Sequence, residues 1–143
     1  MKYIRVAGIS IHFFVGVGAF FGGLAAVLNP ESPLGISPEV LKYGPFTDFF
    51  IPGLTLLIVI GLGNVLSGLL EIKKVPLASY FSGIMGAILI GWIVIQCYIL
   101  QAIAGLHILF FLIGCLQGAL ALISLWITNQ FPMNVVRKII HKE

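Results

Sequence analysis

The polar side chains that could do chemistry in this chain lie within otherwise apolar stretches. His12, Asn64, Ser67, Glu71 and Gln117 form the strongest set. Polar groups inside apolar helices face a bundle interior or a water-filled cavity, and they mark pathways for solutes or protons. At a rise of about 1.5 Å per residue, all five lie in one half of their helices or near the middle. We expect one polar layer, which either hydrogen-bonds the helices together or serves a solute or proton path.

Glu71 also has a simpler interpretation. It lies next to Lys73 and Lys74 at the end of its apolar stretch. Charged side chains near such an end often turn outward, so that the charge reaches water. This interpretation predicts an exposed carboxylate.

A second set of polar residues lies toward the opposite ends of the helices. Gln96, Gln101 and His107 flank the link between the last two apolar stretches, and Asp48 and Thr55 lie near the start of the second. We expect these five residues to line a candidate pocket on the outer side.

No arrangement typical of an enzyme or a metal site accompanies these residues. His12 and His107 would lie about 20 Å apart along the helices, so they cannot hold one haem from both sides. The two cysteines, Cys97 and Cys115, form no CxxC pair, and no general base has a visible partner. The sequence therefore predicts no enzyme, no catalytic residue, no metal and no cofactor.

The composition indicates that lipid surrounds most of the protein surface. Of 143 residues, 59% are hydrophobic and 9% are charged, whereas soluble domains typically carry about 25% charged residues. The net charge of +3 does not indicate nucleic-acid binding, because no basic stripe with interleaved aromatic residues is present. The lipid bilayer is therefore the first partner that the sequence predicts.

Four apolar segments are long enough to cross a bilayer as helices, which requires roughly 20 residues each. They cover residues 6–28, 51–72, 77–100 and 105–127. The links after the second and third segments are only a few residues long, so consecutive helices must be antiparallel neighbours. These features predict an all-α integral membrane four-helix bundle, built of two antiparallel hairpins in a single domain over residues 1–143.

The distribution of basic residues predicts the orientation of the bundle. All eight Lys and Arg residues except Lys42 precede the first segment, lie in the turn after the second, or lie in the tail: Lys2, Arg5, Lys73, Lys74, Arg137, Lys138 and Lys142. Because cytoplasmic loops are enriched in Lys and Arg, we expect both termini to lie in the cytoplasm.

The predicted outer loop, residues 29–50, is rich in proline and aromatic residues. Ser37-Pro38 is typical of a helix start, with Ser as the cap and Pro at the first helical position. Thr47 or Asp48 is expected to cap the second span. The loop is either an aromatic anchor at the membrane surface or a lid over an outward-facing pocket.

Small residues predict where helices approach one another. Gly18 and Gly22 form one GxxxG pattern, and Gly114 and Gly118 form another. In lipid, such faces allow helices, or copies of a chain, to pack closely.

Two spans share a short pattern of glycine and amide residues. Gly61-x-x-Asn64 in the second span matches Gly114-x-x-Gln117 in the fourth. The match either arises by chance or indicates two hairpins related by a parallel pseudo-two-fold axis, as in some transporters.

The segment from Pro45 to Gly53, PFTDFFIPG, resembles one in small four-helix bacterial membrane proteins of unassigned function. In those proteins a short basic turn and a span with a Trp and a Gln follow, like Trp92 and Gln96 here. The resemblance implies a bacterial inner membrane and no known activity. In size and hairpin plan the chain is also similar to DoxX-like four-helix proteins, from which no functional residue is carried over.

The scarcity of reactive groups, the glycine faces and the near absence of extramembrane mass favour an accessory, assembly or self-associating subunit of a membrane complex. Its partners would be further copies of the chain or other membrane subunits. The alternative is a carrier or channel for a small or apolar solute, which the polar layers and the proline-rich loop support. Because four helices enclose little volume, we expect this alternative to require an oligomer.

Overall fold

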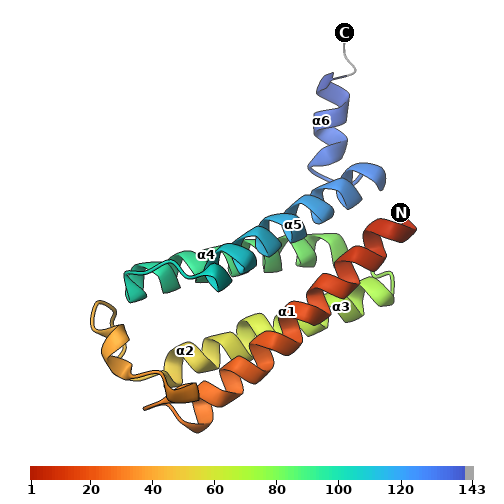
Figure 1. Cartoon of the computed structure of the whole chain (residues 1–143). Helices are drawn as coiled ribbons and strands as arrows, with labels where there is room; N and C mark the ends of the chain where they lie inside the picture. The colour runs from red at the N-terminus through yellow and green to blue at the C-terminus, as the bar shows by residue number, and fades with distance from the viewer. Residues whose placement is uncertain (141–143) are drawn as a thin grey trace.

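The computed structural model describes residues 1–140, which contain helices and no β-strand. Four helical segments are long and apolar enough to cross a membrane (Figure 1). The first is α1 (Lys2–Leu28). The second is one continuous helix that comprises α2 (Phe50–Leu54), the π-helical segment η3 (Thr55–Leu62) and α3 (Gly63–Ile72). The third and fourth are α4 (Ala78–Leu100) and α5 (Gly105–Ile127). The four predicted segments are thereby confirmed as helices. The first begins four residues early, at Lys2 rather than Val6, because no Pro or Gly interrupts residues 2–5.

The four long helices form two pairs. α1 packs along α2, η3 and α3, and α4 packs along α5. We call these the first pair and the second pair, and the interface between them the seam. Across the seam α3 contacts α4 and α1 contacts α5, but more sparsely than helices within a pair (Figure 1). The second and third spans are therefore neighbours, as their short turn predicts, but they do not form a close hairpin.

Glycines allow the helices within each pair to approach closely. A Cβ atom added to Gly23 would lie 2.5 Å from the backbone nitrogen of Leu57 in the first pair. One added to Gly86 would lie 2.8 Å from the carbonyl oxygen of Gly114 in the second. Both distances are too short for any residue with a side chain, so glycine is required for backbones this close.

The predicted glycine faces are only partly used within the chain. Gly114 packs against α4, but Gly18 and Gly118 have no atom within 4 Å of an added Cβ, and one added to Gly22 would meet only a side chain at 3.4 Å. The backbone of Gly118 still lies in the close contact of the second pair, because a Cβ added to Gly86 would be 2.9 Å from its nitrogen. The prediction of close helix packing is therefore wrong only for Gly18 and Gly22. The GxxxG spacing identifies a face of a helix without specifying what meets it, and on α1 the contact face carries Gly23 instead.

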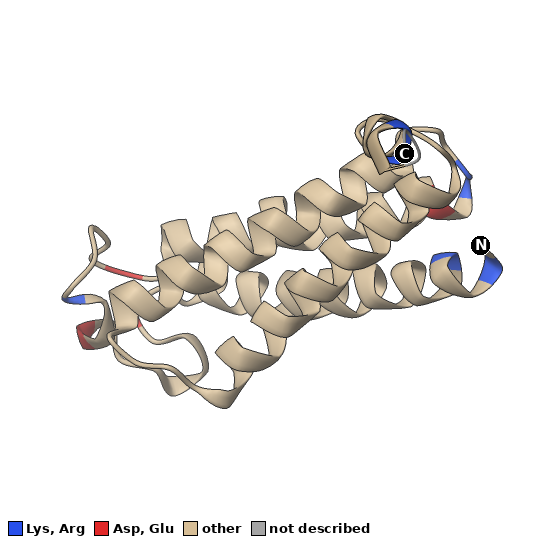
Figure 2. Ribbon diagram, turned by 90° about the horizontal axis from the view of Figure 1, so that it is seen from above, with Lys and Arg blue, Asp and Glu red and all other residues tan. Residues whose placement is uncertain are grey.

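The two ends of the bundle differ in charge. Both termini and the turn between α3 and α4 lie at one end, which we call the terminal end. Residues 29–49 and the link between α4 and α5 lie at the other, the loop end (Figure 1). Most Lys and Arg residues gather at the terminal end together with Glu71, whereas residues 29–49 at the loop end are mainly acidic, with Lys42 as their one basic residue (Figure 2). Lys142, predicted to lie on the basic side, is outside the described residues.

The loop contains two short 3₁₀ helices, η1 (Pro33–Gly35) and η2 (Pro38–Leu41). The Ser37 hydroxyl accepts a hydrogen bond from the Glu39 amide, which confirms the predicted helix start. Asp48 accepts one from the amide of Phe50, the first residue of α2. The N-cap of α2 is Phe49, and no side chain caps the helix. The expected capping of the second span by Thr47 or Asp48 is therefore wrong, because Asp48 lies one residue before the cap and bonds only the first amide.

A further helix, α6 (Met133–Ile140), follows α5 at the terminal end and was not predicted. It runs across the axis of the bundle rather than along it (Figure 1). Its valines and isoleucines are exposed, and the guanidinium of Arg137 lies 5.7 Å from the ring centre of Trp126. α6 therefore extends the basic terminal end without adding to the core.

Candidate functional site

A hydrogen-bonded cluster around His12 lies at the seam. The Nδ1 atom of His12 is 2.8 Å from Oδ1 of Asn64, and its Nε2 atom is 2.7 Å from the hydroxyl of Ser82 and 3.1 Å from that of Ser67. His12, Asn64 and Ser67 have no exposed surface, and Ser82 is 1% exposed. The imidazole therefore has protein partners on both of its nitrogen atoms and no contact with solvent.

The amide of Asn64 determines the tautomer of the neutral imidazole. Its nitrogen donates to the Ile60 carbonyl oxygen at 2.9 Å, so its oxygen must be the atom that faces His12. An amide oxygen only accepts hydrogen bonds. The proton of neutral His12 is therefore on Nδ1, and Nε2 accepts from the hydroxyl groups.

Gln117 joins the cluster from the second pair. Its amide nitrogen donates to Oδ1 of Asn64 at 2.7 Å and lies 3.1 Å from Nδ1 of His12. Its side-chain oxygen is buried and has no hydrogen-bond partner among residues 1–140. His12, Asn64 and Ser67 belong to the first pair, and Ser82 and Gln117 belong to the second. The cluster therefore joins the two pairs by hydrogen bonds across the seam.

Glu71 lies beside this cluster, on the side of the terminal end. Its Oε1 atom is 3.9 Å from Nε2 of His12, and its side chain is 13% exposed. Its Oε2 atom is buried with no hydrogen-bond partner within the described part of the chain. A Cβ added to Gly8 would lie 2.5 Å from Oε2, so the carboxylate fits against α1 because Gly8 has no side chain.

The predicted polar layer therefore exists as a connected arrangement. The structure brings together all five of its members, His12, Asn64, Ser67, Glu71 and Gln117. The interpretation of Glu71 as a side chain that turns outward to water is wrong, because its carboxylate points inward toward α1. Two contributors were missed. Ser82 is one of many small residues in its span, and Gly8 has no polar side chain that would indicate a role in a polar site.

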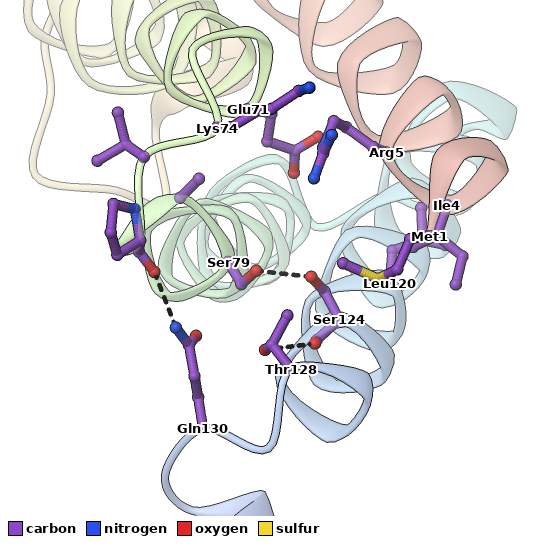
Figure 3. Close-up of a pocket in the computed structure, with 13 residues that line it drawn as sticks. Met1, Ile4, Arg5, Glu71, Lys74, Ser79, Leu120, Ser124, Thr128 and Gln130 are labelled. Carbon is purple, nitrogen blue, oxygen red and sulfur yellow. Dashed lines mark hydrogen bonds between the residues drawn. The ribbon is translucent and has the colours of Figure 1, made fainter.

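A cavity of about 130 Å³ lies at the terminal end, between the two pairs (Figure 3). Arg5 and Glu71, both from the first pair, point toward one another in its wall, and Lys74 also lines it (Figure 3). Ser79 and Ser124, joined by a 2.7 Å hydrogen bond, line the side formed by the second pair. Glu71 therefore connects a polar cavity to the buried imidazole of His12.

A second cavity, of about 290 Å³, lies between the same two pairs nearer the loop end. Most of its lining is apolar, and Gln96 and His107 are its most polar members. Both were predicted for an outer pocket. No residue of the loop lines it. Leu41 is buried, and a Cβ on Gly44 would meet Ile99 of α4, so the loop packs on the end of α4 instead of covering this cavity.

The five residues predicted for one outer pocket do not share a cavity. Asp48 lines a separate surface depression with Pro30. The side chain of Thr55 donates to the carbonyl oxygen of Ile51, and that of Gln101 donates to the carbonyl oxygen of Tyr98. The prediction is wrong for these three because depth along a helix does not specify which way a side chain points.

One apolar layer separates the cluster from the loop-end cavity. Val15, Ile60 and Leu89 are 1–2% exposed, and all three line this cavity. Val15 follows His12 by one turn of α1, and Ile60 precedes Asn64 by four residues. The seam therefore contains, in order, a polar cavity, the polar cluster, an apolar layer and an apolar cavity.

The second helix is irregular just before its contribution to the cluster. η3 is π-helical over eight residues and ends two residues before Asn64. Such wider turns are rare and often accompany functional sites. The carbonyl oxygen of Ile60, within η3, accepts the hydrogen bond from Asn64 and so orients its amide.

Comparison with known proteins adds no relative: no protein-family model, curated protein or solved structure matches the chain. Residues 1–140 contain no group of three or more His, Cys, Asp and Glu side chains placed to hold a metal ion. What the site can do chemically thus rests on an imidazole, a nearby carboxylate and their neutral hydrogen-bond partners.

Proposed function

We propose that the chain is an integral protein of a bacterial inner membrane with both termini in the cytoplasm. Four helices of sufficient length and apolarity support insertion, and the basic terminal end supports this orientation (Figure 2). Fusions of alkaline phosphatase and of green fluorescent protein to the C-terminus test it. Fluorescence without phosphatase activity is expected, and the reverse would refute this orientation.

Within that membrane, we propose that the protein is a carrier for a small, mainly apolar solute. The observation that carries this proposal is the pair of cavities on opposite sides of the His12 cluster, both lined by the same two helix pairs. Rocking of two helical units about a central polar site opens one side while closing the other. The helices have few contacts across the seam and many within each pair. This distribution suits such a motion, because each pair can move as one unit.

The loop-end cavity indicates the solute class. Its volume of about 290 Å³ is near the lower limit of about 300 Å³ for small-molecule pockets. Its lining combines apolar side chains with Gln96 and His107, which suits an apolar body with one polar group. One chain alone lines this cavity, so the proposal does not start from an oligomer, contrary to our expectation from the sequence.

Distances between spin labels in liposomes test the motion. Labels replace Leu28 at the end of α1 and Ile103 in the link before α5, both about three-quarters exposed at 75% and 74%, with Cys97 and Cys115 changed to Ala. A carrier predicts two populations of distances across the seam. The matched control joins Leu77 to Ile103 within the second pair, where one narrow population is expected. One narrow population in both variants would refute the carrier.

A second candidate function, an accessory or self-associating subunit, is favoured by a different surface. An apolar groove of about 380 Å³ runs along α4 and α5 and is lined by small residues that include Gly83, Ala87 and Gly118. An added Cβ on Gly118 would touch nothing, so the groove has room for another helix. Gly118→Ile should then reduce the oligomer mass in native mass spectrometry, whereas Gly91→Ile, at an equally open position, should not.

A further inference from the structure

The bonding around His12 depends on its protonation state. In the neutral form, Nδ1 donates to Asn64 within the first pair, whereas Nε2 accepts from hydroxyl groups that include Ser82 of the second pair. An imidazolium has two donors and no acceptor. Protonation therefore leaves the Asn64 bond unchanged and reverses the role of Nε2 alone.

We infer that His12 and Glu71 form a proton-binding site, and that binding of a proton weakens the contact between the two pairs at the seam. This inference rests on the proposed carrier function, for which it names a coupling ion. A protonated Nε2 lies 3.9 Å from the carboxylate of Glu71, an acceptor that carries a full charge. A charged acceptor forms a stronger bond than a hydroxyl does. The bond from Nε2 therefore moves from Ser82 to Glu71.

This change of partner has a direction within the fold. Ser82 belongs to the second pair, whereas Glu71 belongs to the first, like His12 itself. Moving the bond removes the attachment of His12 to Ser82 between the pairs and strengthens one within the first pair. Gln117 still donates to Asn64, so the seam loosens at one bond while the cluster stays connected.

The charged groups around the site come from the first pair and its turn. α3 contributes Glu71, α1 contributes Arg5, and the turn after α3 contributes Lys74, and all three line the terminal-end cavity. The contacts of His12 with α4 and α5 are to the neutral Ser82 and Gln117. Glu71 is thus the only carboxylate near His12 among residues 1–140, and it neutralises the charge that a proton brings.

The terminal-end cavity provides the route for the proton. Water in the cavity gives a proton to the carboxylate of Glu71, which passes it to the lone pair of Nε2 and returns to its charged form. The proton on Nδ1 stays in place, so the site gains one proton. The apolar layer of Val15, Ile60 and Leu89 on the other side limits exchange to the terminal end.

Nitrogen-15 spectra of His12 in lipid bilayers test the site directly. His107 and His141 are changed to Gln so that one imidazole remains. A neutral ring with its proton on Nδ1 is expected at about pH 9, and an imidazolium at about pH 5. In the Glu71→Gln variant, the proton concentration that protonates the same fraction of His12 should be at least about tenfold higher. Glu39→Gln, at the loop end, is the matched control and should not differ from the parent.

The possible results separate this inference from the carrier proposal. A neutral His12 down to about pH 5 in folded protein, or protonation unaffected by Glu71→Gln, would overturn the proton site. The spin-label populations across the seam would still decide the carrier independently. If His12 becomes protonated but the spin-label distances do not change with pH, the coupling between proton binding and motion at the seam is overturned. If Glu71→Gln does not fold, Gly8→Ala displaces the same carboxylate and should also require more acid for protonation.

Discussion

The interfaces within the helix pairs and the seam between them are built on different principles. Within a pair, glycines bring backbones so close that a Cβ on Gly23 or Gly86 would meet backbone atoms at 2.5–2.9 Å. At the seam, a buried set of hydrogen bonds around His12 joins the pairs, and cavities lie on both sides of it. Close apolar packing gives a rigid unit. A few hydrogen bonds between cavities suit the movable joint that we propose.

The energies of the two interfaces should differ in the same way. Hydrogen bonds between membrane helices average about 0.6 kcal/mol, because the separated helices also find partners. Forcing extra atoms into a close contact costs typically about 1–3 kcal/mol. The pairs should therefore resist substitution more strongly than single bonds at the seam do, and seam substitutions should chiefly alter motion.

The largest effect is expected within the first pair. Gly23→Ala places a Cβ against the backbone of α1's partner helix and should lower the free energy of unfolding by about 2–3 kcal/mol. Gly18→Ala in the same helix meets no atom within 4 Å and should leave that free energy unchanged or slightly raised. Equilibrium unfolding in mixed micelles measures both. Equal losses would show that the pair is not closely packed in the membrane.

A smaller effect is expected at the seam. Asn64→Leu leaves Nδ1 of His12 and the amide of Gln117 without their acceptor, which should cost about 1–2 kcal/mol. Gln96→Leu removes an amide that makes no side-chain hydrogen bond within residues 1–140, and it should cost less than about 0.5 kcal/mol. The same unfolding assay compares them. An equal cost would mean that the cluster contributes nothing specific.

The smallest effect is expected at the edge of the terminal-end cavity. Ser79→Ala removes a hydrogen bond of 2.7 Å to Ser124, which joins α4 to α5 within the second pair. A loss of about 0.6 kcal/mol is expected, with no change in the spin-label populations across the seam. Ser10→Ala, at an exposed position of α1, is the control. A change in those populations with Ser79→Ala would show that the second pair is not a rigid unit.

The polar cluster was largely predictable because polar groups are rare in apolar helices and must find partners there. His12, Asn64 and Gln117 could be assigned to one layer from their depths alone. Ser82 could not, because serine is common in apolar helices and its depth did not distinguish it from Ser79. The inward position of Glu71 depends on the space left by Gly8, which becomes visible only when α1 and α3 are placed together.

The outer pocket was predicted less well for a related reason. Depth follows from counting residues, but the direction of a side chain depends on the rotation of its helix. Gln96 and His107 turn toward the cavity, whereas Thr55 and Gln101 bond to nearby backbone carbonyls. The π-helical segment η3 changes that rotation within the second span, and nothing in its apolar sequence, TLLIVIGL, indicates it.

The most direct test of the account is whether closing one cavity opens the other. Leu28→Cys and Ile103→Cys, in a background without Cys97 and Cys115, are joined across the loop end by a cross-linker shorter than their mean separation. The rate at which a water-soluble maleimide then labels Ser124→Cys in the terminal-end cavity is measured in liposomes. Motion about the His12 cluster predicts a severalfold faster rate after cross-linking. An unchanged or slower rate would contradict a moving seam.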